Sequence, residues 1–169
     1  MRLTILVERI IMKKTITLIR HAEAVFSEYD GDHQRPLTEQ GVVHAQNVAL
    51  KLKRGGVVFD QIHTSDSLRT QQTTSLLNQK LQCSDDHVFI RDNLYCATVT
   101  VLMEAISQLD NQVNHVAMVA HNPGLTVCCE QLMDCYVAPF APATVMTVNL
   151  CVDDWRAVGA GTGITCHAL

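Results

Sequence analysis

The chain has 169 residues and is 47% hydrophobic and 18% charged, a composition typical of one globular domain with a substantial core. Its formal net charge of −4 at pH 7 argues against nucleic acid as the main partner, but it allows a local basic pocket. Seven cysteines, an odd number without a C-x-x-C pair, predict reduced thiols and a cytoplasmic location.

The first residues of the chain do not predict a membrane segment. Residues 3–12 are apolar, but Glu8 and Arg9 interrupt them, and the run is too short and too charged to cross a bilayer. No small-residue cleavage site follows, which argues against a secretory signal. Met12 offers an alternative start directly before two lysines and the first predicted strand. We therefore expect residues 1–11 to be an appendage, residues 12–169 to form a single domain, and no membrane partner.

Apolar and amphipathic stretches alternate along the chain as strand–helix units do. Strands are predicted at about 15–20, 60–64, 87–90, 115–120 and 143–151, with a hairpin partner for the last around 155–158. Helices are predicted at about 39–54, 66–82, 99–109 and 125–134, the first three capped by Thr38, Ser65 and Thr98. Residues 159–169 are predicted as a flexible end or a weak edge strand. The fold class is therefore α/β: a three-layer αβα sandwich with a mostly parallel sheet and a late antiparallel edge hairpin.

Polar and basic side chains follow three of the predicted parallel strands. Arg20 and His21 end the first strand, Ser65 and Arg69 follow the second, and His121 ends the strand at 115–120. The carboxyl ends of parallel strands share one edge of a sheet, so these residues can meet although they are distant in sequence. One strand that ends in solvated polar residues would mean little. Three such ends predict a cationic pocket of phosphate size, in which Arg binds phosphate oxygens and His can attack phosphorus.

Four short motifs occur in order within residues 15–125. They are Arg20-His21-Ala22, Arg35-Pro36-Leu37-Thr38 with Gly41, Ser65 with Arg69, Gln72 and Thr73, and His121-Asn122-Pro123-Gly124. These motifs resemble those of the histidine phosphatase (phosphoglycerate mutase-like) superfamily, and in particular its SixA-type phosphohistidine phosphatases. The resemblance implies the phosphoglycerate mutase-like fold.

The resemblance also implies that His21 is the nucleophile and that Arg20, Arg69 and His121 hold the phosphoryl group. Phosphoryl transfer depends on in-line positioning and on charge stabilisation at the equatorial oxygens, and two guanidiniums supply permanently charged contacts. A neutral imidazole also needs an acceptor for its second nitrogen, which the sequence does not identify. We expect His121 to donate to the phosphoryl oxygens, and we expect no metal or other cofactor.

Each of the remaining candidates has a simpler alternative. Arg35 is a phosphate ligand or a solvated loop residue, and Ser65 is a phosphate ligand or a helix cap. Many family members that cleave esters carry a carboxylate after the third strand, where this chain has Asn93, which is no acid. Glu23 and Asp92 are left as candidate general acids, although Glu23 also fits a solvated loop and Asp92 lies out of register.

The weak or absent acid favours a phosphorus–nitrogen bond in the substrate, because a protonated imidazole leaves readily whereas an alkoxide needs a proton. Short connections predict an open pocket that admits a histidine on another protein. We therefore expect a phosphohistidine phosphatase in signal transduction. Its partner would be a histidine phosphotransfer or carrier protein, and inorganic phosphate would bind in the pocket. The alternatives are a phosphatase of a small phosphate ester on the same fold and a non-catalytic phosphoprotein-binding module.

Overall fold

The computed structural model describes residues 14–26 and 31–169, and the predicted appendage at residues 1–11 lies outside them. Six strands of the described residues form one sheet in the order β3-β2-β4-β1-β5-β6. In chain order these strands are β1 (Lys14–Arg20), β2 (Gln61–Ser65), β3 (Val88–Arg91), β4 (His115–Ala120), β5 (Val145–Leu150) and β6 (Gly163–Ala168). The first four are parallel, whereas β5 runs antiparallel to β1 and β6. The predicted α/β class and mostly parallel sheet are confirmed.

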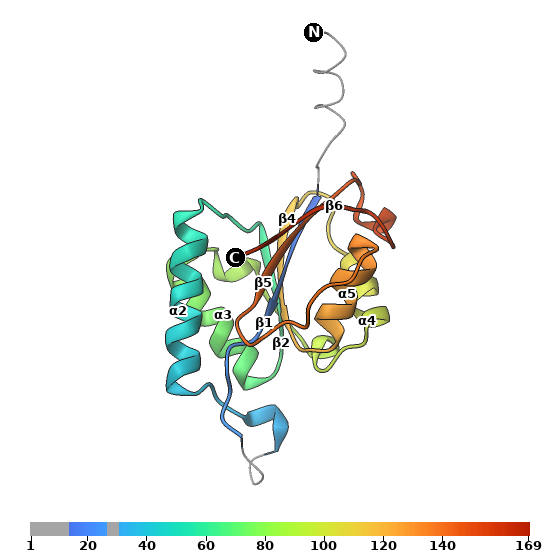
Figure 1. The fold of residues 1–169 in the computed structure, drawn as a ribbon. Coiled ribbons are helices and arrows are strands. Elements are labelled where there is room, and N and C mark those ends of the chain that lie inside the picture. The colour runs from blue at the N-terminus through green and yellow to red at the C-terminus, as the bar shows by residue number, and fades with distance from the viewer. Residues whose placement is uncertain (1–13, 27–30) are drawn as a thin grey trace.

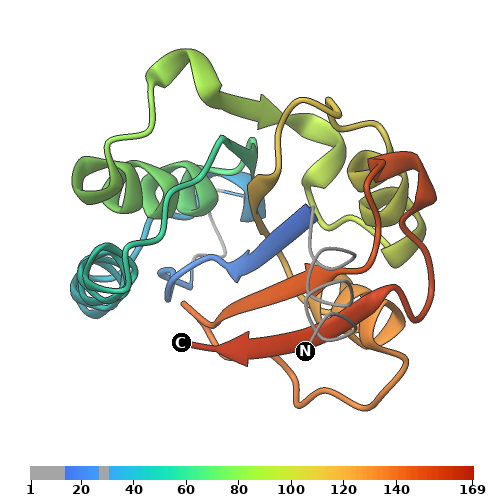
Figure 2. The ribbon, with the colours of Figure 1, turned by 90° about the horizontal axis from the view of Figure 1, so that it is seen from above.

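Helices cover both faces of the sheet (Figure 1). They are α2 (Glu39–Arg54), α3 (Leu68–Leu81), α4 (Val99–Ser107) and α5 (Gly124–Met133). Figure 2 shows α2 and α3 together on one face and α4 and α5 on the other, which completes the three layers. Among the helices of residues 14–26 and 31–169, none is both long and apolar enough to cross a membrane.

The helix starts follow from local chemistry that the sequence displays. Thr38 Oγ1 accepts from the Gly41 amide at 2.9 Å, and Thr98 Oγ1 accepts from the Val101 amide at 3.5 Å, so both predicted caps are confirmed. The predicted cap at Ser65 is wrong. This residue ends β2, and α3 begins three residues later, after Ser67.

The predicted hairpin partner around residues 155–158 is also wrong. That segment contains the short 3₁₀ helix η4 (Trp155–Ala157), and the strand that pairs with β5 is β6. Trp155 is fully buried, and its indole Nε1 donates to the Val113 carbonyl at 3.0 Å. Burial of this large side chain draws the segment onto the core before the chain returns as an edge strand. The weak edge strand predicted within residues 159–169 is confirmed.

Two motif glycines lie where the backbone of another segment approaches closely. A Cβ at Gly41 would lie 2.1 Å from the Glu23 carbonyl oxygen, and a Cβ at Gly124 would lie 2.1 Å from the Ala97 carbonyl oxygen. Only glycine permits these approaches. The first contact packs the start of α2 against the loop that follows His21, and the second packs the start of α5 against the loop before α4.

We predict that Gly41→Ala lowers the free energy of unfolding by about 1–3 kcal/mol, because the added methyl overlaps a backbone oxygen. The loss is expected even though alanine has the higher helix propensity. Gly159→Ala is the matched control, since a Cβ there meets nothing within 4 Å. Urea unfolding of the three proteins tests this, and a Gly41→Ala midpoint equal to that of wild type would show that the contact is not as tight as described.

Candidate active site

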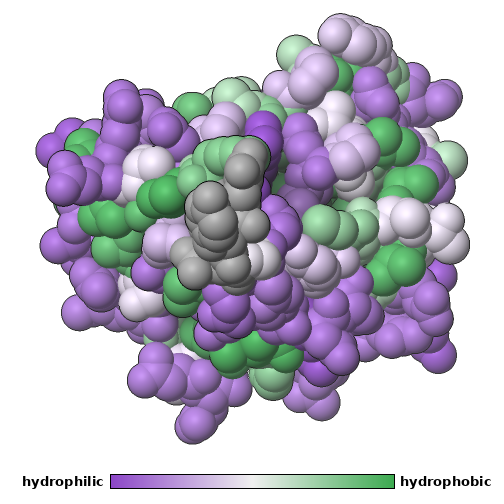
Figure 3. All heavy atoms as spheres, turned by 90° about the horizontal axis from the view of Figure 1, so that it is seen from below, coloured by the Kyte–Doolittle hydropathy of each residue, from purple (hydrophilic) through white to green (hydrophobic). Residues whose placement is uncertain are grey.

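The residues predicted to form a site gather at one edge of the sheet, where β1, β2 and β4 end. This edge faces the bottom of Figure 1, beside the 3₁₀ helix η1 (Asp32–Gln34). Figure 3 views the molecule from that side and shows hydrophilic residues over much of the face. Arg20, His21, Arg69 and His121 all lie at this edge, because each follows or ends one of these strands.

His21 is held in one tautomer by the backbone. Its Nδ1 lies 2.8 Å from the Ala22 carbonyl oxygen, and a carbonyl only accepts, so Nδ1 carries the proton. The lone pair is therefore on Nε2, which accepts from Arg69 Nε at 3.3 Å. This carbonyl is the acceptor that the sequence does not identify. Burial, together with the positive charges of Arg69 and Arg20, lowers the pKa of His21 to about 4.

Arg69 is the centre of the site and is only 3% exposed. Its Nη1 donates to the Asp32 carbonyl at 2.5 Å, and its Nη2 donates to Asp32 Oδ2 at 2.8 Å. The same Nη2 lies 3.3 Å from His121 Nδ1. Together with the contact to His21, these bonds connect the ends of β1 and β4 to η1 through one guanidinium.

His121 is neutral in the unliganded site. Burial lowers its pKa to about 3, and the positive charge of Arg69 adds to the effect. Because Arg69 only donates, His121 Nδ1 carries the lone pair and Nε2–H donates to Ser65 Oγ at 3.0 Å. Ser65 thus positions His121, a role different from the predicted helix cap. In this structure His121 donates its Nε2–H to Ser65 Oγ, whereas the sequence analysis predicted that it donates to phosphoryl oxygens.

Arg20 lies on the inner side of the site. Its Nη1 donates to the Phe140 carbonyl at 2.6 Å, and the same carbonyl accepts from Asn122 Nδ2 at 2.9 Å. Its Nε is buried and has no hydrogen-bond partner among the described residues. Desolvation lowers the pKa of Arg20 from its ordinary value. An anion in the site would give this nitrogen an acceptor.

Asp32 and Tyr95 are site residues that sequence reasoning missed. Asp32 Oδ1 accepts from Arg35 Nη1 at 2.7 Å, and Asp32 Oδ2 accepts from the Tyr95 hydroxyl at 2.6 Å. Hydrogen bonds from Tyr95, Arg35 and Arg69 hold the pKa of Asp32 far below its ordinary value. The D-x-x-R spacing of Asp32 and Arg35 was the available signal, since it places an acid one turn before a motif arginine. Arg35 also donates from Nε to the Val25 carbonyl at 2.6 Å.

The remaining residues of the second-strand motif fasten the loops of the site to α3. The Thr73 hydroxyl oxygen accepts from the Ala22 amide at 3.1 Å, which fixes the backbone next to His21. Gln72 Oε1 accepts from the Leu37 amide at 2.8 Å, which fixes the Arg35 segment. Both side chains therefore position the site from outside it.

Neither predicted general acid is placed as one. Asp92 Oδ1 accepts from the Asn93 amide at 2.7 Å and so closes the 3₁₀ helix η3 (Asp92–Leu94). Glu23 is exposed, and its backbone carbonyl accepts from the Thr38 amide at 3.0 Å. Asn93 is also exposed. The carboxylate that does reach Arg69 is Asp32.

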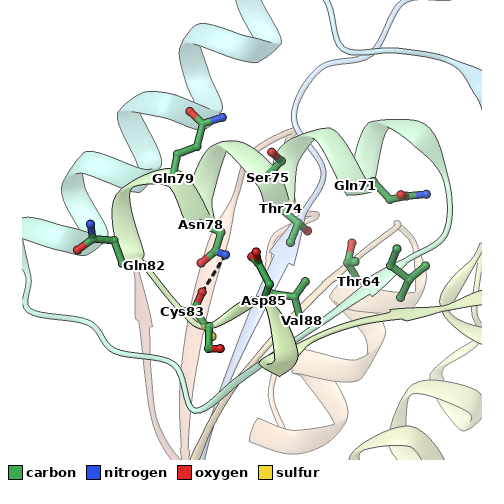
Figure 4. Close-up of a pocket in the computed structure, with 12 residues that line it drawn as sticks. Thr64, Gln71, Thr74, Ser75, Asn78, Gln79, Gln82, Cys83, Asp85 and Val88 are labelled. Atoms are coloured by element: carbon green, nitrogen blue, oxygen red, sulfur yellow. Dashed lines mark hydrogen bonds between the residues drawn. The ribbon is translucent and has the colours of Figure 1, made fainter.

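A separate groove of about 730 Å³ runs along α3 toward β3 (Figure 4). Uncharged polar side chains, including Thr74 and Asn78, form much of its lining, and Figure 4 shows them along the helix. None of the predicted catalytic residues lines it. The groove is therefore distinct from the site around His21.

The site around His21 combines a neutral imidazole lone pair with nearby guanidiniums. Such a pair suits attack on an electron-poor atom that carries anionic oxygens, because the cations stabilise charge that develops on those oxygens. Arg20 and Arg69 supply charge that does not depend on pH over the physiological range. The arrangement is suited to phosphoryl transfer.

Comparison with known proteins agrees with this arrangement. Residues 16–94 match the sequence model of the histidine phosphatase superfamily, branch 1. The fold is similar to a candidate phosphohistidine phosphatase SixA from Nakamurella multipartitia, with a TM-score of 0.75 and 24% identity over 91% of this chain and 95% of that one. It is also similar to a protein histidine phosphatase SixA complexed with tungstate, with a TM-score of 0.78 and 22% identity over 91% and 96% of the two chains. The family match covers somewhat less than half of the chain, and the two solved structures show the same fold.

A curated protein of known name also shares sequence with part of this chain. It is a 2,3-bisphosphoglycerate-dependent phosphoglycerate mutase from Bradyrhizobium diazoefficiens, 35% identical over 68 residues. The match covers 38% of this chain and spans about a third of the length of that relative, 33%. The chain thus resembles a phosphoglycerate mutase in part of its sequence and SixA proteins in its fold.

We predict that the stability of this protein falls between pH 6.5 and pH 4.5. The pKa values of His21 and His63 are lowered to about 4 and that of His121 to about 3, chiefly by burial. Unfolded histidines bind protons below pH 6.5 while these native ones stay neutral, so acid favours the unfolded state. Urea midpoints measured at several pH values across this window should decrease steadily as the pH falls.

Burial also lowers the pKa of His115. The control for this prediction is His63→Gln, which removes one of these four titrations and leaves the site around His21 intact. Its urea midpoint should depend less steeply on pH than that of wild type. The carboxylates with lowered pKa values titrate below this window and leave the comparison unaffected. Parallel pH profiles of the two proteins would contradict the assignment.

Proposed function

We propose that this chain is a phosphohistidine phosphatase that acts through a phospho-His21 intermediate. Its substrate would be a phosphohistidine on a histidine phosphotransfer or carrier protein of a phosphorelay, and inorganic phosphate would be the product. The observation that carries this proposal is the fixed tautomer of His21, whose lone pair on Nε2 lies 3.3 Å from Arg69 Nε. A phosphoryl group bound to Arg69 would be adjacent to that lone pair.

The pKa of the nucleophile supports this role. A histidine with a pKa of about 4 is neutral throughout the physiological range, so its lone pair needs no separate base. After attack, the proton on Nδ1 remains hydrogen-bonded to the Ala22 carbonyl and balances charge on the phosphorylated ring. The backbone therefore serves both the free and the phosphorylated states of His21.

Arg20, Arg69 and His121 would stabilise the transferred group. Arg20 has a buried Nε without a partner among the described residues, and Arg69 lies between the two histidine rings. A phosphoryl dianion next to His121 raises the pKa of that ring, because an anion favours the charged imidazolium. His121 can then donate to a phosphoryl oxygen in the complex, although it is neutral in the free site.

The surroundings of the site favour a phosphorus–nitrogen bond over an ester. Asp92 and Glu23 are not directed to the site by any contact described above, and Asp32 is held ionised, so it has no proton to give at neutral pH. An alkoxide leaving group requires an acid, whereas a protonated imidazole does not. The similar fold of the two SixA proteins, one a candidate phosphohistidine phosphatase and one a protein histidine phosphatase, supports the same choice.

A protein partner fits the mouth of the site. Only four residues separate η3 from α4, which leaves little chain to cover a bound substrate. Phe26 is 78% exposed, and Arg35 Cζ lies 5.9 Å from the centre of its ring. An exposed aromatic residue next to an arginine is the type of side chain that anchors protein interfaces. We propose that the reaction takes place in the cytoplasm, where seven free cysteines would stay reduced.

We predict that His21→Ala lowers phosphate release from a phosphohistidine-bearing protein by at least about a thousandfold, because the nucleophile is lost. Wild type incubated with that ³²P-labelled protein should acquire an acid-labile label that is stable to base, as phosphohistidine is. His21→Ala should acquire none. His44→Ala, at an exposed position on α2, is the matched control and should behave as wild type does.

The alternatives give different results in the same assay. Faster release from small phosphate esters than from the phosphoprotein would favour the ester phosphatase, for which the phosphoglycerate mutase similarity is the supporting observation. Binding of the phosphoprotein without label or release would favour the non-catalytic binding module.

A further inference from the structure

Asp32 occupies an unusual position at the mouth of the site. Its carboxylate accepts hydrogen bonds from Arg69, Arg35 and Tyr95, yet 47% of its side chain is exposed. Arg69, by contrast, is only 4% exposed at its side chain. Asp32 is therefore a carboxylate with fixed orientation that both solvent and a bound partner can reach.

Arg69 sets the position of Asp32 relative to the nucleophile. Its Nε contacts His21 Nε2, its Nη1 donates to the Asp32 backbone carbonyl, and its Nη2 donates to Asp32 Oδ2. The nucleophile and the carboxylate thus contact the same guanidinium. In-line displacement sends the leaving group away from His21, toward the exposed side of the site. Asp32, with 47% of its side chain exposed, is within reach of a group that leaves toward solvent.

The leaving group of a phosphohistidine has a hydrogen-bond donor for a carboxylate that the leaving group of an ester lacks. When the ring is protonated, the nitrogen remote from phosphorus carries an N–H on a cationic imidazolium. A carboxylate forms a charge-assisted hydrogen bond with such a group. An alcohol leaving group has no cationic N–H, and one with further anionic substituents is repelled by the same carboxylate.

We propose that Asp32 makes the site selective for phosphorus–nitrogen substrates by accepting the N–H of the protonated imidazole leaving group. This inference rests on the proposed function and assigns the part of the site that distinguishes the two substrate classes. Tyr95 and Arg35 hold the carboxylate in place through its two oxygens. Nothing in the reaction requires Asp32 to gain or lose a proton.

The first transfer balances without any other reactant. The lone pair of His21 Nε2 forms a bond to phosphorus while the bond from phosphorus to the substrate nitrogen breaks. The electron pair of that bond remains on the substrate ring, which leaves as neutral imidazole with its proton on the remote nitrogen, hydrogen-bonded to Asp32. Water then attacks phosphorus, the electron pair returns to His21 Nε2, and phosphate is released.

The test compares two substrates that share the phosphoryl group and differ in the leaving group. Phosphoimidazole has a leaving group that can be protonated, and p-nitrophenyl phosphate has one that needs no acid. We expect Asp32→Asn to reduce the ratio of kcat/KM for phosphoimidazole over p-nitrophenyl phosphate by about 10- to 100-fold, the range of one charge-assisted hydrogen bond. A carboxylate that only positioned Arg69 would lower both rates together and leave the ratio unchanged.

Two further variants complete the experiment. Asp66→Asn removes the same charge from a carboxylate that lies 3.0 Å from His33 Nε2, and it should leave the ratio unchanged. Tyr95→Phe keeps the charge of Asp32 and loses one of its hydrogen-bond donors, so its ratio should fall by less than that of Asp32→Asn. A ratio that falls equally in Asp66→Asn would indicate a general charge effect and overturn the assignment.

The outcomes separate this inference from the proposed function. If wild type hydrolyses p-nitrophenyl phosphate but neither phosphoimidazole nor a phosphohistidine protein, the proposed function fails and the assignment fails with it. If wild type hydrolyses phosphoimidazole and Asp32→Asn changes kcat/KM for both substrates by the same factor, the assignment alone is overturned. An equal rise would identify Asp32 as an internal anion that competes with phosphate for Arg69.

Discussion

Burial of the Arg69 guanidinium is the constraint on which the site depends. A permanent charge in a nearly inaccessible position is tolerated only when its donors find acceptors, because an unpaired buried charge is very costly. Those acceptors come from His21 after β1, His121 after β4 and Asp32 in η1. The same contacts that stabilise the charge therefore bring together segments that are distant in sequence. In this protein, the acceptors that pair with the donors of Arg69 are also the groups that make up the site.

This constraint also determines the protonation states around it. His21 and His121 lie next to buried positive charge, and desolvation together with that charge lowers the pKa of both. Asp32 experiences the same cations with the opposite consequence, since they stabilise its ionised form. Neutral rings in the interior and an ionised carboxylate at the mouth thus have one electrostatic cause. The site separates a nucleophilic interior from an acceptor at the entrance without a titration near pH 7.

The sequence predicted the inner residues better than the residues at the mouth. Arg20, His21, Arg69 and His121 could be placed together because parallel strands end at a common edge, which needs only element order and strand direction. The acceptor of His21 is a backbone carbonyl, and a backbone group leaves no mark in a motif. Tyr95 and Asp32 meet across a long stretch of chain, so no local spacing joins them. Trp155 was misplaced for a related reason, since burial by distant residues overrode its strand propensity.

The division between interior and mouth has a consequence for substrate choice. In the proposed reaction, transfer from a phosphohistidine to His21 exchanges one imidazole for another, so the chemistry at phosphorus is nearly symmetric and the interior needs no acid. In each ring the proton stays on the nitrogen remote from phosphorus, and each needs an acceptor there. The protein provides one for its own ring in the Ala22 carbonyl. For the substrate ring the acceptor must lie at the mouth, where Asp32 is the carboxylate joined to Arg69. A phosphatase that cleaves esters needs the opposite, a proton donor at the entrance, and its interior can remain the same. Substrate class in such a site is therefore set by the charge and protonation of the entrance, and the nucleophile has little part in it.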